Sequence, residues 1–215
     1  MRHWLTDRGS LTRRLKAHCS DFRVRPLATG LARPNADEHK LLLLRPGSLA
    51  YVREVLLSCH GKPVVFAHSV LPRSGLRGGW NGITRLGARP LGEALFNDHR
   101  IKRESLAYLR LSPHHALFHA ASPHHAFGAP ARGTPAGTPL PRSDLSAAPA
   151  RGTPAGTPLL GSDPSAAPAS GTPPDARPAG GVGAAQPMWA RRSVFSLNGR
   201  PLLVTEVFLP GIEHL

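Results

Sequence analysis

A tandem repeat divides this chain and limits what the rest of it can fold into. Residues 131–149 read ARGTPAGTPLPRSDLSAAP, and residues 150–168 repeat them as ARGTPAGTPLLGSDPSAAP, a period of 19 residues. Solenoid repeats recur at similar periods, but each of their units carries an apolar face on which its neighbour stacks. These units have almost no large apolar residues. The repeat therefore predicts a segment without a packed core.

Proline is concentrated around this repeat, since 15 of the 23 prolines lie between residues 112 and 187. Such a composition buries too little apolar surface to offset the entropy of the chain. We therefore predict that residues 121–187 are a disordered insert, and that residues 1–120 and 188–215 form one interrupted domain. Near-identical copies are typical of a recent duplication; a proline-rich ligand is the alternative interpretation.

The net charge of the chain is +14, and only four of its 27 lysines and arginines fall in the insert. A folded part this basic indicates an acidic partner, which could be nucleic acid, a membrane surface or a small polyanion. The basic residues are scattered and show no helix-turn-helix pattern, which disfavours nucleic acid. The sequence has no stretch near the roughly 20 apolar residues of a membrane span.

The first residues, MRHWLTDRGSLTRRLK, lack the apolar run of a signal peptide. The two cysteines, Cys19 and Cys59, have no CxxC spacing, which fits free thiols in a reducing compartment and no metal site. We therefore expect a soluble, cytoplasmic protein.

Hydrophobic periodicity and turn residues predict an α+β fold, a mainly antiparallel sheet with flanking helices. The CHGK and Asn198-Gly199 turns each join two apolar runs, as in β-hairpins. Ser10 is placed to cap one helix, and Pro90 to begin another. We expect strands over residues 51–58, 64–71, 105–111, 193–197 and 201–209, and helices over residues 11–19 and from residue 90.

Glu206 lies in the middle of an apolar strand, RPLLVTEVFLP, in which neither face is polar. A buried carboxylate needs a partner or a purpose. A two-residue turn at Asn198-Gly199 places Glu206 opposite Arg191 on the neighbouring strand. A structural ion pair and a ligand contact both fit this position.

Arg53 poses the same question on the first hairpin, where it shares an apolar face with Val55 and Leu57. A two-residue turn at His60-Gly61 would place Arg53 opposite His68, with both side chains facing one cavity. An arginine on an apolar face is more often part of a core ion pair than a ligand clamp. Together with Glu206, however, it would suit a small ligand with a carboxylate at one end and a hydroxyl at the other.

Other catalytic signals are weak. His114, His115, His119, His124 and His125 precede the insert, but no cysteine or carboxylate is spaced with them, so we expect no metal site. The sequence has no GxSxG motif, phosphate-binding loop or dinucleotide fingerprint.

Three blocks of the chain resemble the chorismate pyruvate-lyase family: YVREVLLSCHGKPVVFAHSVLP, LGARPLGEALF and WARRSVFSLNGRPLLVTEVFLP. With SLTRRL they cover most of the chain outside the insert, in the family's order. The resemblance implies an enzyme that converts chorismate to 4-hydroxybenzoate and pyruvate at the start of ubiquinone synthesis, without a cofactor. It also implies a mainly antiparallel sheet with mobile flaps over the product, and we expect a monomer.

The family's ligand positions fall on Leu11, Arg53, Leu91 and Glu206. The resemblance implies that Arg53 and the backbone N–H groups of Leu11 and Leu91, in first helical turns, hold a carboxylate. It leaves Glu206 for the hydroxyl, so Arg53 and Glu206 are the expected catalytic residues. His68 stands where the family often has arginine, and the insert is foreign to the family pattern. The alternatives are a ligand-sensing module of the kind found in transcription regulators, or a basic nucleic-acid-binding protein.

Overall fold

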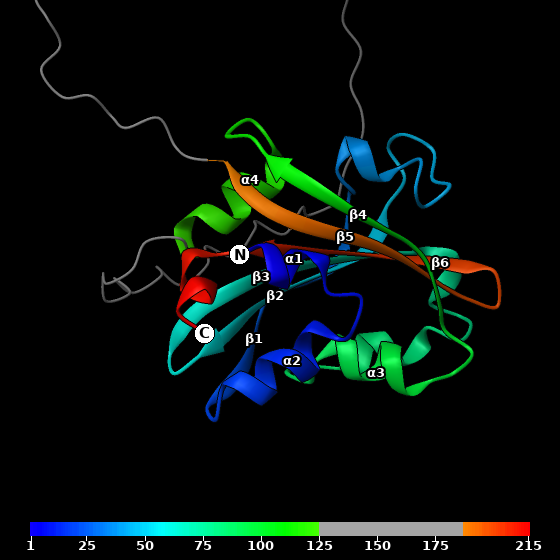
Figure 1. The fold of residues 1–215 in the computed structure, drawn as a ribbon. Coiled ribbons are helices and arrows are strands. Elements are labelled where there is room, and N and C mark those ends of the chain that lie inside the picture. The colour runs from blue at the N-terminus through cyan, green and yellow to red at the C-terminus, as the bar shows by residue number, and fades with distance from the viewer. Residues whose placement is uncertain (125–186) are drawn as a thin grey trace, which may run out of the picture. The chain divides into compact units, whose positions relative to one another are not determined.

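The computed structural model describes residues 1–124 and 187–215. It forms a six-stranded antiparallel sheet with the strand order β1-β2-β3-β6-β5-β4 (Figure 1). This architecture confirms the predicted α+β class. The repeat lies outside the described residues. Residues 121–124, which the sequence assigns to the insert, instead belong to the folded part. Ala121 is the last residue of the helix Ala116–Ala121 and is fully buried, and Ser122–His124 form a 3-10 turn after it.

Short helices flank the sheet. The strands are β1 Phe22–Ala32, β2 Ala50–Cys59, β3 Lys62–Pro72, β4 Lys102–Leu111, β5 Met188–Leu197 and β6 Arg200–Phe208. The α-helices are α1 Arg2–Thr6, α2 Leu11–His18, α3 Leu91–Asn97 and α4 Ala116–Ala121, and the 3-10 helices are η1 Ala36–Glu38, η2 Arg73–Gly75, η3 Asn81–Arg85, η4 Ser122–His124 and η5 Pro210–His214.

The sheet is covered on both faces. Helices α2 and α3 lie below it in Figure 1, and α4 lies above it with the segment that contains η1. On the α2/α3 face, apolar residues of α1, α2 and α3 pack against inward-facing residues of β2, β3, β5 and β6. On the α4 face, Leu117 and Phe118 pack against Leu56, Phe66 and Val207. Alternate residues of each strand therefore belong to two separate cores.

Strand β1 was not expected from the sequence. It contains Pro26 and Gly30, which weaken a strand signal, and its side chains are half-buried or exposed throughout. Proline is tolerated at a sheet edge, where its missing N–H breaks no ladder. β1 is such an edge strand, and its pairing with β2 shifts register between Pro26 and Ala28.

The C-terminal hairpin forms as predicted. Asn198 and Gly199 have φ values of 52° and 72°, as a two-residue turn with a left-handed backbone requires. Leu197 therefore pairs with Arg200, and Arg191 pairs with Glu206.

The predicted register of the first hairpin is wrong. Ser58 pairs with Pro63, but Leu57 pairs with Val65, so Val64 is an extra residue in β3. Its carbonyl accepts a hydrogen bond from the Leu209 backbone N–H at 3.0 Å, which holds this bulge in place. Shifting a register by one residue moves each later side chain to the other face.

As a result, Arg53 lies opposite Ser69, and His68 lies opposite Glu54. Arg53 and His68 thus face opposite sides of the sheet and do not share a cavity.

The expectation of two free thiols is also wrong in this structure. Cys19 follows the last turn of α2, Cys59 ends β2, and the two form a disulfide with a Cα–Cα distance of 5.8 Å. Because 40 residues separate them in sequence, only the packing of α2 on the sheet brings them together.

The helix starts follow the sequence closely. The Ser10 hydroxyl accepts a hydrogen bond from the Arg13 backbone N–H at 3.3 Å and caps α2. Pro90 is the N-cap of α3 rather than its first residue. Among the described residues, no helix has the length and apolarity to cross a membrane.

Candidate active site

The candidate site lies on the α2/α3 face, where Arg53 and Glu206 come from strands on either side of β3. Arg53 pairs with Ser69 of β3, and Glu206 pairs with Ala67. The two Cα atoms are thus two strands apart and offset by two residues, or about 12 Å from each other. On the intervening strand β3, the side chains on this face between them are small: Ala67 and Ser69. The strand between the two charges therefore carries no large side chain on this face.

Arg53 is almost completely buried, with 2% of its surface exposed, and burial lowers the pKa of its guanidinium. Its Nη2 donates to the carbonyls of Gly87 and Arg89, both at 2.9 Å, and so holds the loop that precedes α3. The buried Nε has no hydrogen-bond partner among the described residues. The structure thus places Arg53 directly beneath the start of the helix that carries Leu91.

Glu206 forms an ion pair with the Nε of Arg191. Arg191 is 1% exposed, and its Nη1 donates to the Asp7 carbonyl at 2.7 Å, in the loop that precedes α2. This confirms the predicted pair. The pair uses Oε2 of Glu206, and the carboxylate remains partly exposed, so its other oxygen is available to a ligand.

The N-termini of α2 and α3 meet over this site. A Cβ on Gly92 would lie only 2.8 Å from Thr12 Oγ1 and 3.3 Å from Ser10 Oγ, so the glycine lets the two first turns touch. Leu11 and Leu91 stand at the two starts, both with buried side chains. Sheet arginines hold both preceding loops, Arg191 for α2 and Arg53 for α3. The predicted positions therefore belong to one linked arrangement.

Arg103 was not singled out from the sequence, although it belongs to the same face. Its guanidinium carbon lies 4.9 Å from the ring centre of Phe96 in α3 and 5.0 Å from that of Phe195 in β5. Burial and the charge of Arg191 lower the pKa of Arg103, whereas Glu206 raises it. In the sequence, Arg103 sits in the polar start of a strand, KRES, which gave no reason to expect an inward side chain.

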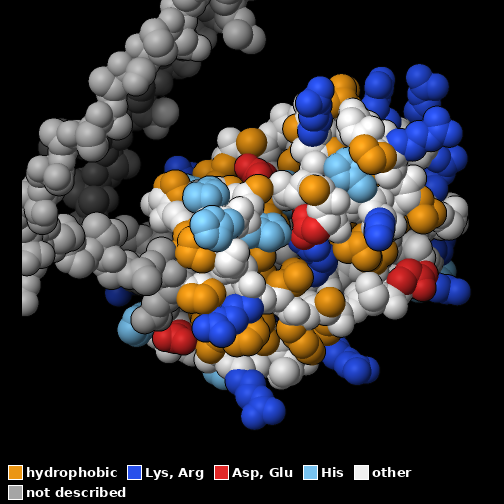
Figure 2. Space-filling model, turned by 90° about the horizontal axis from the view of Figure 1, so that it is seen from above, with side chains coloured by type: hydrophobic (Ala, Val, Ile, Leu, Met, Phe, Trp, Pro, Cys, Tyr) orange, Lys and Arg blue, Asp and Glu red, His pale blue; other side chains and the backbone are white. Residues whose placement is uncertain are grey.

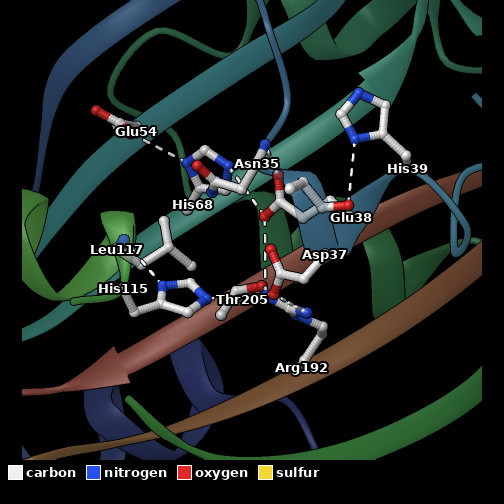
Figure 3. A network of polar contacts seen from close by, with 11 residues as sticks. Asn35, Asp37, Glu38, His39, Glu54, His68, His115, Leu117, Arg192 and Thr205 are labelled. Carbon is white, nitrogen blue, oxygen red and sulfur yellow. Dashed lines mark hydrogen bonds and ion pairs between the residues drawn. The ribbon is translucent and has the colours of Figure 1, made fainter. Parts of the chain in front are cut away.

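A second polar cluster lies on the opposite, α4 face of the sheet (Figure 3). His68 Nδ1 is 3.0 Å from Glu54 Oε1, and His68 Nε2 is 3.3 Å from Glu38 Oε1. Burial disfavours the charged ring, but hydrogen bonds to the two carboxylates outweigh it and raise the pKa of His68 to about 9.

Arg192 extends this cluster along the same face. It donates to Thr205 Oγ1 at 3.1 Å and to Asp37 Oδ2 at 2.8 Å. Together with the Glu38–His68 pair, these contacts fasten η1 to the sheet. They occupy the face of the sheet opposite Arg53 and Glu206.

The histidines before the insert have other contacts. His115 Nδ1 accepts from the Leu117 N–H at 3.1 Å and caps α4, and the His124 ring stacks on Phe66. His125 lies outside the described residues. Within the described residues, the group whose ligand atoms come within reach of one ion is Cys19, Cys59 and His60, and its two cysteines are disulfide-bonded.

The family model for chorismate lyase matches residues 1–122 of this chain. A protein of Thiobacillus denitrificans named "Probable chorismate pyruvate-lyase" is 41% identical over 212 residues, covering 99% of this chain and 83% of that protein. A protein of the same name from Aromatoleum aromaticum is 42% identical over 215 residues, covering 100% of this chain and 87% of that protein.

Solved structures resemble the chain far less. A GntR-family transcriptional regulator from Bacillus cereus aligns over 89% of this chain and 94% of its own, with 11% identity and a TM-score of 0.46. A likeness that low carries no functional argument. The sequence relatives are decisive, and the chain belongs to the chorismate lyase family.

Proposed function

We propose that this protein is a chorismate pyruvate-lyase, which eliminates pyruvate from chorismate to give 4-hydroxybenzoate for ubiquinone synthesis. The observation that carries this is its membership of the family, with relatives 41–42% identical over essentially the whole chain. The α2/α3 face supports it independently, because a buried cation and a carboxylate flank a floor of small side chains.

In this proposal the ring carboxylate of the substrate binds Arg53. Nη2 of Arg53 is already used by the loop carbonyls, whereas Nε is buried without a partner among the described residues. The Nε–H can therefore donate a charge-assisted hydrogen bond to the carboxylate while Nη2 keeps the loop attached. The backbone N–H groups of Leu11 and Leu91 add donors from the two helix starts.

Glu206 takes the hydroxyl end of the substrate. Its ion pair with Arg191 fixes its orientation, so it can accept a hydrogen bond from the ring hydroxyl. The small residues Ala67 and Ser69 leave space for the ring between the two ends. Arg53 and Glu206 then set the position of the ring along the sheet.

The reaction is an elimination. The bond between one ring carbon and the enolpyruvyl oxygen breaks, and a proton leaves the neighbouring ring carbon, so that the ring becomes aromatic. The departing enol becomes pyruvate when its methylene carbon gains a proton. Aromatisation supplies driving force, so the protein mainly orients the substrate and excludes water. The proton moves either to Glu206 or directly to the enolpyruvyl group.

The direct test is incubation of the purified full chain with chorismate while 4-hydroxybenzoate is followed by absorbance and pyruvate is quantified separately. Equal amounts of both products support the proposal. Binding of chorismate without any product would instead favour a sensing module.

The proposal also covers partners and organisation. We propose a cytoplasmic monomer without cofactor or nucleic acid, in which residues 1–124 and 187–215 form one domain. Figure 2 shows the molecule from above, where Lys and Arg side chains crowd one end and project singly elsewhere, and such a charge would attract a small dianion.

Light scattering after gel filtration tests the monomer. Thiol counting in cell extracts tests the compartment, since disulfides are uncommon in the cytosol.

A further inference from the structure

The α2/α3 face holds two arginines that form no ion pair with any carboxylate of the described residues. Among the described residues, five arginine side chains are buried or half-buried. Three of them form ion pairs, with Asp7, with Glu206, and with Asp37 and Glu38. The other two have no acidic partner within the described chain. The paired arginines are Arg14, Arg191 and Arg192, and the two left over are Arg53 and Arg103.

Arg103 lies close to Glu206. Its Nη1 donates to the carbonyl of Arg8, and Arg191 donates to the carbonyl of Asp7, the preceding residue of the same loop. The two guanidinium groups are therefore neighbours, and Arg191 in turn holds Glu206. Arg103 thus places a positive charge at the Glu206 end of the site, and Arg53 places one at the opposite end.

The side chain of Arg103 is also held ready for an anion. Phe96 and Phe195 present their rings to the guanidinium, which fixes its plane and removes water from it. Its Nε is buried without a partner among the described residues. Arg103 lines an open hollow of about 490 Å³, together with Arg8, Glu104 and Tyr108. A carboxylate entering from this hollow would meet an oriented, poorly solvated cation.

The chemistry of the substrate calls for such a cation. Chorismate carries two carboxylates: one on the ring, and one on the enolpyruvyl group, which is attached next to the carbon that bears the hydroxyl. If Arg53 binds the ring carboxylate and Glu206 the hydroxyl, the enolpyruvyl carboxylate lies near Glu206. Arg191 cannot neutralise it fully because its charge is already shared with Glu206.

We infer that Arg103 binds the enolpyruvyl carboxylate of chorismate and is a specificity-determining residue of this site. The inference rests on the proposed function, because it assumes the substrate orientation set by Arg53 and Glu206. It assigns the two unpaired arginines to the two carboxylates of one dianion. The alternative is that Arg103 only holds the Arg8 loop in place.

The two roles differ in what they predict for the product, because 4-hydroxybenzoate lacks the enolpyruvyl carboxylate. Arg103→Gln removes the charge but keeps a polar amide on the two rings. We expect kcat/KM for chorismate to fall roughly 30-fold to 5,000-fold, the usual range for losing one charged contact. The Kd of 4-hydroxybenzoate, measured by calorimetry, should stay within about threefold of the wild-type value, since product binding uses only the Arg53 and Glu206 ends.

Arg110→Ala is the matched control, an exposed arginine on the same strand, and should change neither quantity. Arg103→Lys, which keeps a charge without the planar fork, should recover part of the lost kcat/KM. If Arg103→Gln weakens 4-hydroxybenzoate as much as it slows chorismate turnover, Arg103 only supports the loop and the inference fails. If kcat/KM is unchanged, the second carboxylate binds elsewhere. A wild-type protein that does not turn over chorismate would instead remove the proposed function itself.

Discussion

Replacing Glu206 with glutamine tests whether this residue serves the substrate or only its partner Arg191. Glutamine has nearly the same shape, and its amide oxygen can still accept from the Arg191 Nε. Arg191 is 1% exposed and keeps its 2.7 Å bond to the Asp7 carbonyl, so it does not lose all its partners. Glu206→Ala, in contrast, leaves a buried charge uncompensated, which typically costs about 3–5 kcal/mol of folding free energy. Glutamine is therefore the informative change.

The expected loss can be estimated for the ligand. A hydrogen bond to a charged group contributes about 1.5–3 kcal/mol, which corresponds to roughly a 10-fold to 150-fold change in Kd. We expect Glu206→Gln to weaken 4-hydroxybenzoate by an amount in this range. Benzoate, which lacks the hydroxyl, should bind the variant and the wild type almost equally.

Calorimetric titration of 4-hydroxybenzoate and of benzoate into the wild type and into Glu206→Gln gives the four Kd values. Thermal unfolding shows whether the variant is folded. Equal weakening of benzoate and 4-hydroxybenzoate would refute the assignment of Glu206 to the hydroxyl. The Arg191–Glu206 pair would then be a structural feature alone.

Three further outcomes follow from the site, the opposite face and the insert. Arg53→Ala should lower kcat/KM for chorismate by an amount equivalent to about 2–5 kcal/mol of transition-state stabilisation, and it should also weaken the binding of 4-hydroxybenzoate. Arg53→Lys should recover little of this loss, because a point charge cannot replace the planar guanidinium. Full activity in Arg53→Lys would contradict this expectation. Because the pKa of His68 is raised to about 9, its contribution to stability is complete below pH 6.5 and is lost as the pH rises past about 9. The unfolding temperature should therefore drop over this interval more in the wild type than in His68→Gln, and parallel curves would exclude His68 as the cause. Deleting residues 128–185 and joining the ends with a short Gly/Ser linker should keep lyase activity within a few-fold, whereas loss of folding would show that the insert is needed.

Local signals in the sequence predict most of the sheet. The Asn198-Gly199 turn determines the pairing of Arg191 with Glu206, since a two-residue turn leaves a single register. The same reasoning fails for the first hairpin because Val64 is an extra residue, held by Leu209, which follows β6 and is far away in the sequence. Nothing within CHGK reveals that long-range bond. A bulge is a tertiary feature here, and one residue of shift moved His68 to the other face.

The site likewise contains residues that the sequence can predict and residues that it cannot. Arg53 and Glu206 are detectable because a charge in an apolar strand is conspicuous. Arg103 is not detectable in this way, since it stands among polar neighbours and becomes buried only through Phe96 and Phe195. The pairing of Cys19 with Cys59 likewise depends on where α2 packs. Residues whose role depends on contacts between distant segments are those that local patterns miss.

The arginines of the α2/α3 face connect ligand binding with the position of the helices that cover the ligand. Arg53 holds the carbonyls of Gly87 and Arg89, while Arg191 and Arg103 hold those of Asp7 and Arg8. Arg53 and Arg103, which would bind the two carboxylates of the substrate, thus also help to hold the starts of α3 and α2 against the sheet. Arg103 and Arg191 repel each other, and burial disfavours the charges of Arg53 and Arg103; a bound dianion relieves both costs. The substrate should therefore stabilise the arrangement of α2 and α3 that encloses it.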